Sequence, residues 1–395
     1  MIRYGRSTGV FFAILILVLT VFFSGCGKNG SSDTPVNVVE PVIEESDPSA
    51  QDTSAENGTE DTAADTDVPP AEGMVRSRIT NEWVTEEQNN SRPVAVMIPN
   101  SRTASQFGIS RASVLYEANV EGDMTRLMAI VDEWQDLEKL GNIRSIRDYF
   151  VFWGFEWDPI FIHYGGPFYI NAVVDREDTQ NINCLSYSEG SFRDQAKDDT
   201  DNAFVSADRI RKAADHFGYQ LEYRAGYADE QHYRFAPEKE PNTLEQYDKA
   251  MKAGKIDLSR AYPNTNTYFL YNGETGLYDR YQHLPKTDEG PHIDLMNNEQ
   301  LSFKNVIVQN TYYEKRDSKG YLAFRCHDTT NDGWFFTNGR GIHVTWRKES
   351  DYGATRYYDD EGKEVLFNTG KTMVCILEGG DAILVDGSAY SSGGS

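Results

Sequence analysis

From Tyr262 onward the chain consists of short segments rich in Val, Ile, Phe, Tyr and Trp, and this feature constrains the fold most. Such residues favour extended strands, and the Asn-Gly, Asp-Glu-Gly and Gly-Arg-Gly turns between the segments are typical of antiparallel neighbours. The segments occupy residues 266–282, 303–315, 320–328, 333–348, 354–368 and 371–387. We therefore predict a mostly antiparallel β-rich domain, a sheet or small barrel, over residues 262–389, with a flexible tail at 390–395.

Residues 81–236 show a different pattern, in which strands and helices alternate. A tight-turn sequence at 121–124 joins two of the strands as a hairpin, and residues 206–218 carry a helical pattern. The predicted strands occupy residues 92–98, 112–120, 125–134 and 158–166. The alternation predicts an α/β or α+β domain, with a linker or crossover at 237–261. Because the body of the chain exceeds the usual size of one core, we expect two domains that each fold alone.

The first residues have the order of an export signal. Arg3 and Arg6 precede an apolar run at 10–23, which is short for a membrane-spanning helix. A serine and a glycine then stand directly before Cys26. This order resembles the lipobox of bacterial lipoproteins, in which the cysteine receives a diacylglycerol. We predict a signal peptide over 1–25, lipidation of Cys26 and a place at the outer face of the cytoplasmic membrane; the alternative is an ordinary signal peptide with an incidental cysteine.

Residues 26–80 are predicted to be a disordered acidic linker between the lipid anchor and the body. Residues 27–75 contain one lysine against twelve Asp and Glu, and no aromatic residue. Such a composition cannot bury enough apolar surface to offset the entropy of ordering. The whole chain has a net charge of −24, with no compact basic cluster. This charge excludes nucleic acid as a partner and leaves the anchor as the expected contact with the membrane.

Three cysteines remain in the body, at Cys184, Cys326 and Cys375. No Cys-x-x-Cys or Cys/His spacing indicates zinc, and the sequence predicts neither a metal site nor a cofactor. We expect the three side chains to be small buried hydrophobic groups, although one disulfide, such as Cys326 with Cys375, is the alternative.

Separated pieces of the sequence together resemble the YerB-like lipoproteins of Gram-positive bacteria. In the first domain these pieces are RPVAVMI, VLYEANVEGDMTRLMAIV and GNIRSIRDYF. In the second they are YDRYQHLPKTD, NVIVQ, GRGIHVTWRK and YYDDEGKEVLFNTGKTMVCIL. The resemblance covers residues 92–377 and implies a lipid-anchored surface protein with two domains. The family has no established reaction, so it implies no catalytic residue.

The stretch GNIRSIRDYFVFWGFEW at 141–157 sets two arginines against a run of aromatic residues. Ser145 is expected to cap an aromatic helix, and arginines beside a helix start would form a small pocket for an anion. An acidic turn and a histidine at a strand end complete the candidate ligand-binding site, which comprises Glu117, Glu121, Arg126, Arg144, Ser145, Arg147 and His163.

A structural role for these residues is the competing interpretation. The arginines would then pair with Glu117, Glu121 or Asp148 and hold the domain together, because buried carboxylates need such partners. His163 alone is more often a satisfied core histidine than a catalyst. The helix aromatics, spaced by four residues, are expected to be buried rather than to stack on sugars.

The sequence contains no serine-hydrolase elbow, zinc-protease motif or nucleotide loop, so an enzyme is not favoured. The leading hypothesis is a non-enzymatic envelope protein that binds cell-wall fragments or a wall-synthesis partner. A hydrolase of wall glycan or peptide, using Glu121 or His163, is the second. A substrate-binding lipoprotein that feeds a transporter is the third. The sequence does not predict an oligomeric state.

Overall fold

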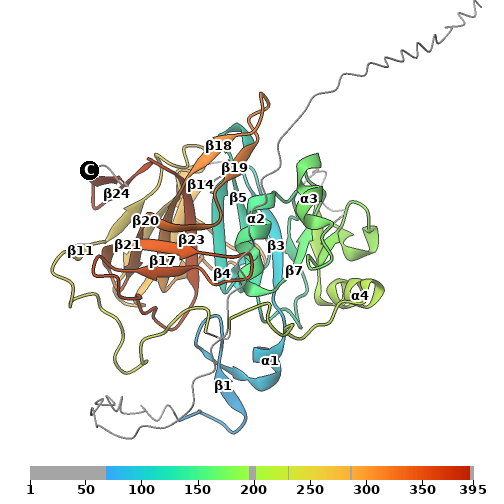
Figure 1. The fold of residues 1–395 in the computed structure, drawn as a ribbon, viewed down its shortest axis with the longest axis horizontal. Helices are drawn as coiled ribbons and strands as arrows, with labels where there is room; N and C mark the ends of the chain where they lie inside the picture. The colour runs from blue at the N-terminus through green and yellow to red at the C-terminus, as the bar shows by residue number, and fades with distance from the viewer. Residues whose placement is uncertain (1–67, 195–201, 230, 285–286, 392–395) are drawn as a thin grey trace, which may run out of the picture. The chain divides into compact units, whose positions relative to one another are not determined.

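An eleven-stranded mixed sheet forms the centre of the region that the structure describes (Figure 1). The structure is a computed structural model, which describes residues 68–194, 202–229, 231–284 and 287–391. The strands of this central sheet, in spatial order, are β11 (Met251–Lys252), β21 (Arg340–Lys348), β20 (Asp328–Thr337), β17 (Asn305–Thr311), β23 (Thr372–Glu378), β4 (Val114–Asn119), β5 (Thr125–Val131), β3 (Val94–Asn100), β7 (Ile160–His163) and β8 (Asn181–Asn183), with β22 (Arg356–Tyr358) paired to β21. The predicted signal peptide, Cys26 and most of the linker lie outside the described residues. The prediction of a disordered linker up to residue 80 is too long, because Met74–Arg76 form a strand and Ile79 is buried in a hydrophobic core. Residues 390 and 391 likewise belong to the strand Ser388–Ser391 and not to a flexible tail.

A second, antiparallel sheet packs against part of the central one. Its strands are β15 (Thr287–Pro291), β14 (Leu277–Leu284), β13 (Tyr268–Asn272), β12 (Lys255–Asp257), β24 (Ala382–Val385) and β25 (Ser388–Ser391), with β16 (Ser302–Phe303) paired to β14. Smaller sheets pair β1 (Met74–Arg76) with β2 (Trp83–Thr85), β18 (Tyr313–Lys315) with β19 (Leu322–Phe324), and β10 (Ala203–Val205) with both β6 (Leu140–Gly141) and β9 (Phe192–Arg193).

The helices are few and short. They are α1 (Glu86–Asn90), α2 (Asp148–Gly154), α3 (Asn171–Val174) and α4 (Ala207–Phe217), with 3₁₀ turns η1 (Ile109–Arg111), η2 (Glu121–Asp123), η3 (Phe155–Trp157), η4 (Phe168–Ile170) and η5 (Ser188–Gly190). No described helix has the length and apolar character needed to cross a lipid bilayer. Gly218 ends α4 in the left-handed conformation, at φ 71°, as the helical pattern predicts.

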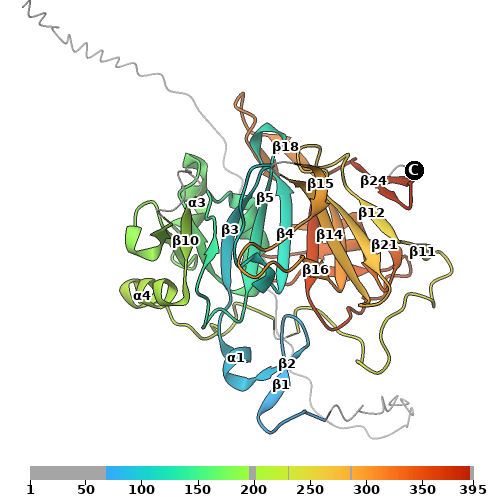
Figure 2. The same cartoon turned by 180° about the vertical axis from the view of Figure 1, so that it is seen from behind.

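Two hydrophobic cores lie on opposite faces of the central sheet, because side chains alternate along each strand. On β3, Val96 faces one core and Met97 the other. The first core is closed by the second sheet and α4, and the other by α2 and α3. Figure 1 shows α2 over β4 and β5, and Figure 2 shows β14 on the side seen from behind.

The expected fold class is confirmed. The first part of the chain combines helices with strands, and the second part is β-rich and mostly antiparallel. The predicted hairpin is the antiparallel pair β4–β5, joined through η2, and β7 lies parallel to β3. The 237–261 segment contributes the short strands β11 and β12, so it crosses between the sheets as part of them. Cys184, Cys326 and Cys375 are buried free thiols, as expected.

The two halves share the central sheet. Strand β23, from near the end of the chain, pairs in parallel with β4 on one side and with β17 on the other. A buried ion pair adds to this connection, because Arg280 Nη2 of β14 lies 2.8 Å from Glu117 Oε2 of β4, with both side chains fully enclosed. Asn100 Nδ2 and Thr125 Oγ1 each donate to Glu117 Oε1 at 2.8 Å.

Separate folding of residues 81–236 is therefore not expected. Without the second half, β4 would have an open edge, and the apolar side chains of the first core that face the second sheet would be exposed to water. A fragment of residues 81–236 should show no cooperative melting in calorimetry, whereas the chain with both halves should show one transition. A cooperative transition of the fragment alone would contradict the shared core.

Three buried histidines are held neutral. Burial lowers the pKa of His163, His232 and His292, and the neighbouring Arg280 lowers that of His292 further. The ring nitrogens of His163 lie 2.8 Å from Gly165 O and 3.1 Å from Asn181 Oδ1, and the single N–H of the neutral ring donates to one of these oxygens. His232 stacks on Trp157 with ring centroids 3.6 Å apart.

Stability should fall as the pH is lowered from about 7.5 to about 6. The folded pKa of each histidine lies below the unfolded value of about 6.5, so the unfolded chain takes up the protons, at up to about 1.4 kcal/mol per histidine per pH unit. Urea unfolding at several pH values measures this slope. His163→Gln should reduce the slope, because it removes one histidine whose pKa is lowered by burial. A pH-independent stability in this range would contradict the assignment.

Candidate anion-binding site

The start of α2 carries an ion pair that the sequence predicted in outline. Arg147 donates from Nε to Glu121 Oε2 at 3.0 Å and also contacts Glu121 Oε1 through Nη2. Arg147 is 4% exposed, whereas the Glu121 side chain is 28% exposed. Burial acts to raise the pKa of Glu121, but the hydrogen bonds and charge of Arg147 outweigh it and lower that pKa. For this pair the structural interpretation holds.

Arg126 of β5 lies beside this pair. Its Nη1 donates to Ser145 O at 2.6 Å, and Arg147 Nη1 approaches the same carbonyl oxygen at 3.3 Å. Among the residues that the structure describes, no carboxylate lies within ion-pair distance of Arg126, and its buried Nε has no hydrogen-bond partner. Burial lowers the pKa of Arg126 to about 10, and the charges of Arg147 and Arg144 contribute to that shift.

Arg144 and Ser145, which precede α2, make different contacts from those predicted. Ser145 does not cap α2, because Arg147 occupies the N-cap position and no side chain caps the helix. Ser145 Oγ instead donates to Tyr164 O at 3.0 Å. The backbone of Arg144 lies between strand ends, since its N–H donates to Met97 O at 2.8 Å and its carbonyl accepts from Tyr164. The seven-residue helix therefore places Arg147 beside Glu121, but its start is not a capped anion site.

Two residues that the prediction missed join the site, Arg316 from the β18–β19 hairpin and Tyr169 from η4. Arg316 Nη2 contacts Asp148 Oδ2, and its guanidinium lies 4.4 Å from the ring centroid of Tyr169. Burial raises the pKa of Asp148 despite this arginine. The hydroxyl of Tyr169 is buried without a hydrogen-bond partner. No local signal marks Arg316, because it lies in a polar turn far along the chain.

These groups form what we call the α2 arginine cluster, which comprises Glu121, Arg126, Arg144, Arg147, Asp148, Tyr169 and Arg316. Among the described residues, the guanidinium groups of Arg126, Arg147 and Arg316 have two carboxylates near them, and these pair with Arg147 and Arg316. Arg126 Nε and Tyr169 Oη have no hydrogen-bond partner within the described ranges. Arg126 is thus a partly buried cation without a carboxylate of its own there, in a chain with a net charge of −24. Guanidinium groups suit carboxylate and phosphate oxygens, so the arrangement can accept an anion.

Two predicted site residues lie elsewhere. Glu117 faces the opposite side of the central sheet, where Arg280 neutralises it. His163 is fully enclosed and both its ring nitrogens face protein oxygens. Tyr149, Trp153 and Trp157 are buried, as expected for core aromatics. Within the described ranges, no group of His, Cys, Asp and Glu side chains has an arrangement that could hold a metal ion.

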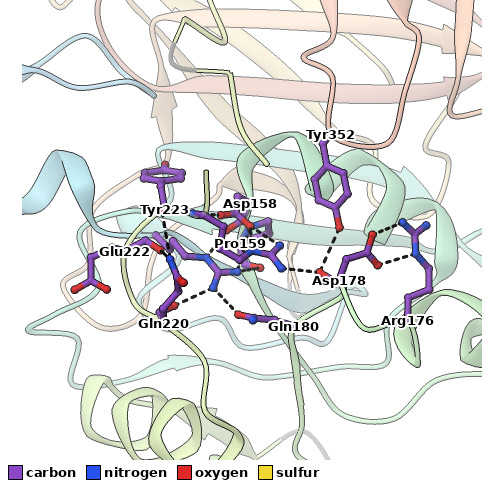
Figure 3. Close-up of polar contacts among 11 residues, drawn as sticks. Asp158, Pro159, Arg176, Asp178, Gln180, Gln220, Glu222, Tyr223 and Tyr352 are labelled. Carbon is purple, nitrogen blue, oxygen red and sulfur yellow. Dashed lines mark hydrogen bonds and ion pairs between the residues drawn. The ribbon is translucent and has the colours of Figure 1, made fainter. Parts of the chain in front are cut away.

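A second arginine cluster offers a comparison, because its buried arginine has a carboxylate partner, which it shares with Arg224 (Figure 3). Arg92 is completely buried, and its Nε donates to Asp158 O at 2.9 Å while Nη2 lies 3.3 Å from Asp158 Oδ1. Arg224 Nε donates to the same carboxylate at 2.7 Å, and Gln180 and Gln220 accept from Arg92 Nη1. Arg92 therefore has a carboxylate and several carbonyls, whereas Arg126 has one carbonyl.

Comparison with known proteins places the chain in a family. Residues 79–220 match the family described as "Protein of unknown function (DUF3048) N-terminal domain", and residues 256–374 match its C-terminal domain. The chain is similar to the protein named "Putative lipoprotein YerB" of Bacillus subtilis (strain 168), with 25% identity over 80% of this chain and 90% of that protein.

A crystal structure of YerB from Bacillus subtilis has the same fold. It matches with a TM-score of 0.64 and 21% identity, and the match covers 77% of this chain and 96% of the YerB chain. Both matched domains and the agreement in fold lead to one conclusion: the chain belongs to the DUF3048 family, a two-domain family of unknown function.

Proposed function

We propose that the protein is a lipid-anchored binding protein of the cell envelope, which holds an anionic group of cell-wall material at the α2 arginine cluster. The observation that carries this proposal is Arg126, a partly buried cation with two like-charged neighbours and no carboxylate within ion-pair distance among the described residues. An anionic oxygen at this place would supply the missing negative charge.

The anchoring rests on the first residues and on the relative. The order of charge, apolar run, small residues and Cys26 resembles a lipoprotein signal, and the similar Bacillus subtilis protein carries a lipoprotein name. A long acidic linker would keep the equally acidic body away from anionic lipid, because like charges repel.

Binding is favoured over hydrolysis by the states of the two candidate catalytic groups. A glycosidase acid needs a raised pKa, whereas the pKa of Glu121 is lowered by Arg147. His163 is sealed in the core, where both its ring nitrogens face protein oxygens. A transporter-type binding protein is less well supported, since a hinge between two similar lobes does not fit a sheet that runs through both halves.

Replacing the predicted lipidated residue should detach the protein from the membrane. Acyl chains contribute about 0.8 kcal/mol per buried methylene, so Cys26→Ser should move the protein into the medium or leave an uncleaved precursor. Fractionation with an antibody to the body measures this distribution, and Cys184→Ser serves as a matched control that should stay on the membrane. Mature, membrane-bound Cys26→Ser protein would contradict the anchor.

Removing the unpaired charge should abolish anion binding at little cost to folding. Arg126→Gln keeps a donor for Ser145 O but removes a cation that has no partner, so the melting temperature should stay the same or rise. Calorimetric titration with two probes, a muropeptide with free carboxylates and a polyol-phosphate oligomer, should show binding of at least one to the wild type and a loss of about tenfold or more in the variant.

Two controls separate binding from scaffolding. Arg347→Gln, at an exposed arginine of β21, should leave both affinity and melting unchanged. Arg147→Gln should lower stability by about 1–3 kcal/mol, between the values for exposed and buried ion pairs, because it removes the partner of Glu121. If neither probe binds the wild type, or if Arg126→Gln binds as the wild type does, the proposed site is wrong.

A further inference from the structure

A groove of about 670 Å³ lies far from α2 in the fold, at the end of the central sheet formed by β20 and β21. We call it the aromatic groove and define it by five of its lining residues, Tyr247, Trp334, His343, Asp360 and Tyr390. These residues come from β20, β21, β25, the turn after β22 and the chain that leads into β11. Neither matched domain carries a known function that would assign this groove.

The face of the sheet changes from core to open surface along β20. Phe336 is fully buried, but Trp334, two residues earlier on the same face, is only partly buried, and so is Asp332. The second sheet covers this face as far as Tyr390 of β25, whose ring centroid lies 5.3 Å from that of Trp334. The indole is therefore supported on one side and remains accessible on the other.

A histidine directly opposite Trp334 is fixed by two carboxylates. Trp334 and His343 are partners in the β20–β21 ladder, and their ring centroids lie 5.3 Å apart. His343 Nδ1 lies 2.6 Å from Asp360 Oδ1, and its Nε2 lies 3.2 Å from Asp332 Oδ1. Asp360 Oδ2 lies 3.5 Å from Nζ of the exposed Lys249. Because the Asp360 side chain is 45% exposed and each carboxylate oxygen accepts more than one hydrogen bond, acceptor positions that face solvent remain.

The charge of the groove limits its ligands. His343 lowers the pKa of Asp360, which stays ionised and accepts hydrogen bonds only. Acidic residues outnumber the two lysines of the lining, which comprises Asp248, Lys249, Asp359, Asp360, Glu361 and Lys363 among its charged members. A phosphate or carboxylate ligand would be repelled here, in contrast to the α2 arginine cluster.

We propose that the aromatic groove binds a pyranose sugar without negative charge, with one sugar face on Trp334 and its hydroxyls on the Asp360 carboxylate. A partly exposed indole offers a flat apolar platform, and an adjacent fixed carboxylate accepts hydrogen bonds from neighbouring hydroxyls. The groove does not depend on the α2 arginine cluster, so each site can fail without the other.

The experiment uses the full chain and an oligomer of β-1,4-linked N-acetylglucosamine as the probe. Titration should give saturable binding with a change in tryptophan fluorescence, confirmed by calorimetry. Asp360→Asn and Trp334→Leu should each weaken binding by about tenfold or more, since each removes one main contact. Glu349→Gln, at an exposed carboxylate beyond the groove, and Arg126→Gln, in the α2 arginine cluster, should leave the affinity unchanged.

The proposal is overturned if the oligomer does not bind saturably, or if either groove variant keeps full affinity. Asp360→Asn keeps the test informative should Trp334→Leu fold poorly, because Asp360 is exposed and the change keeps its shape. Equal weakening by Glu349→Gln would show that the effect is one of general surface charge and would also overturn the assignment.

Discussion

The parallel pairing of β23 with β4 is the interaction on which the rest of the structure depends. It joins strands from opposite ends of the body, and through it the sheet, the two cores and the second sheet become continuous. The enclosed Glu117–Arg280 pair joins β4 of this sheet to β14 of the second sheet. Because a buried carboxylate is costly without its cation, this contact favours the native arrangement over a slipped or separated one.

Local features of the fold could be predicted from the sequence, because they arise from neighbouring residues. The β4–β5 hairpin follows from two apolar runs around a tight turn, and α4 follows from its helical pattern and closing glycine. The position of β23 could not be predicted in the same way, because a buried strand presents the same apolar pattern beside any neighbour. The position of β23 depends on its pairing with distant segments, and no local sequence pattern indicates that pairing.

The candidate site shows the same division. Glu121, Arg126 and Arg147 come from stretches of chain that the hairpin and the start of α2 bring together, and their contacts place them side by side. Glu117, which was also a candidate for this site, does not join them. In the hairpin Glu117 lies opposite Leu127, and Ala118 lies opposite Arg126, so the acid and the arginine point to different cores. Arg316 and Tyr169 joined the site only through tertiary packing.

The place of β23 in the centre of the sheet also sets an order of events during biosynthesis. A chain is made from its N-terminus, so β4 is complete long before residues 372–378 exist. Until then β4 has an unpaired edge, and such edges pair readily with other chains. Long-range strand pairing is also slow to form. The nascent protein therefore depends on residues 372–378 to close the sheet, and a chain truncated shortly before β23 would carry an unpaired strand edge that other chains can bind.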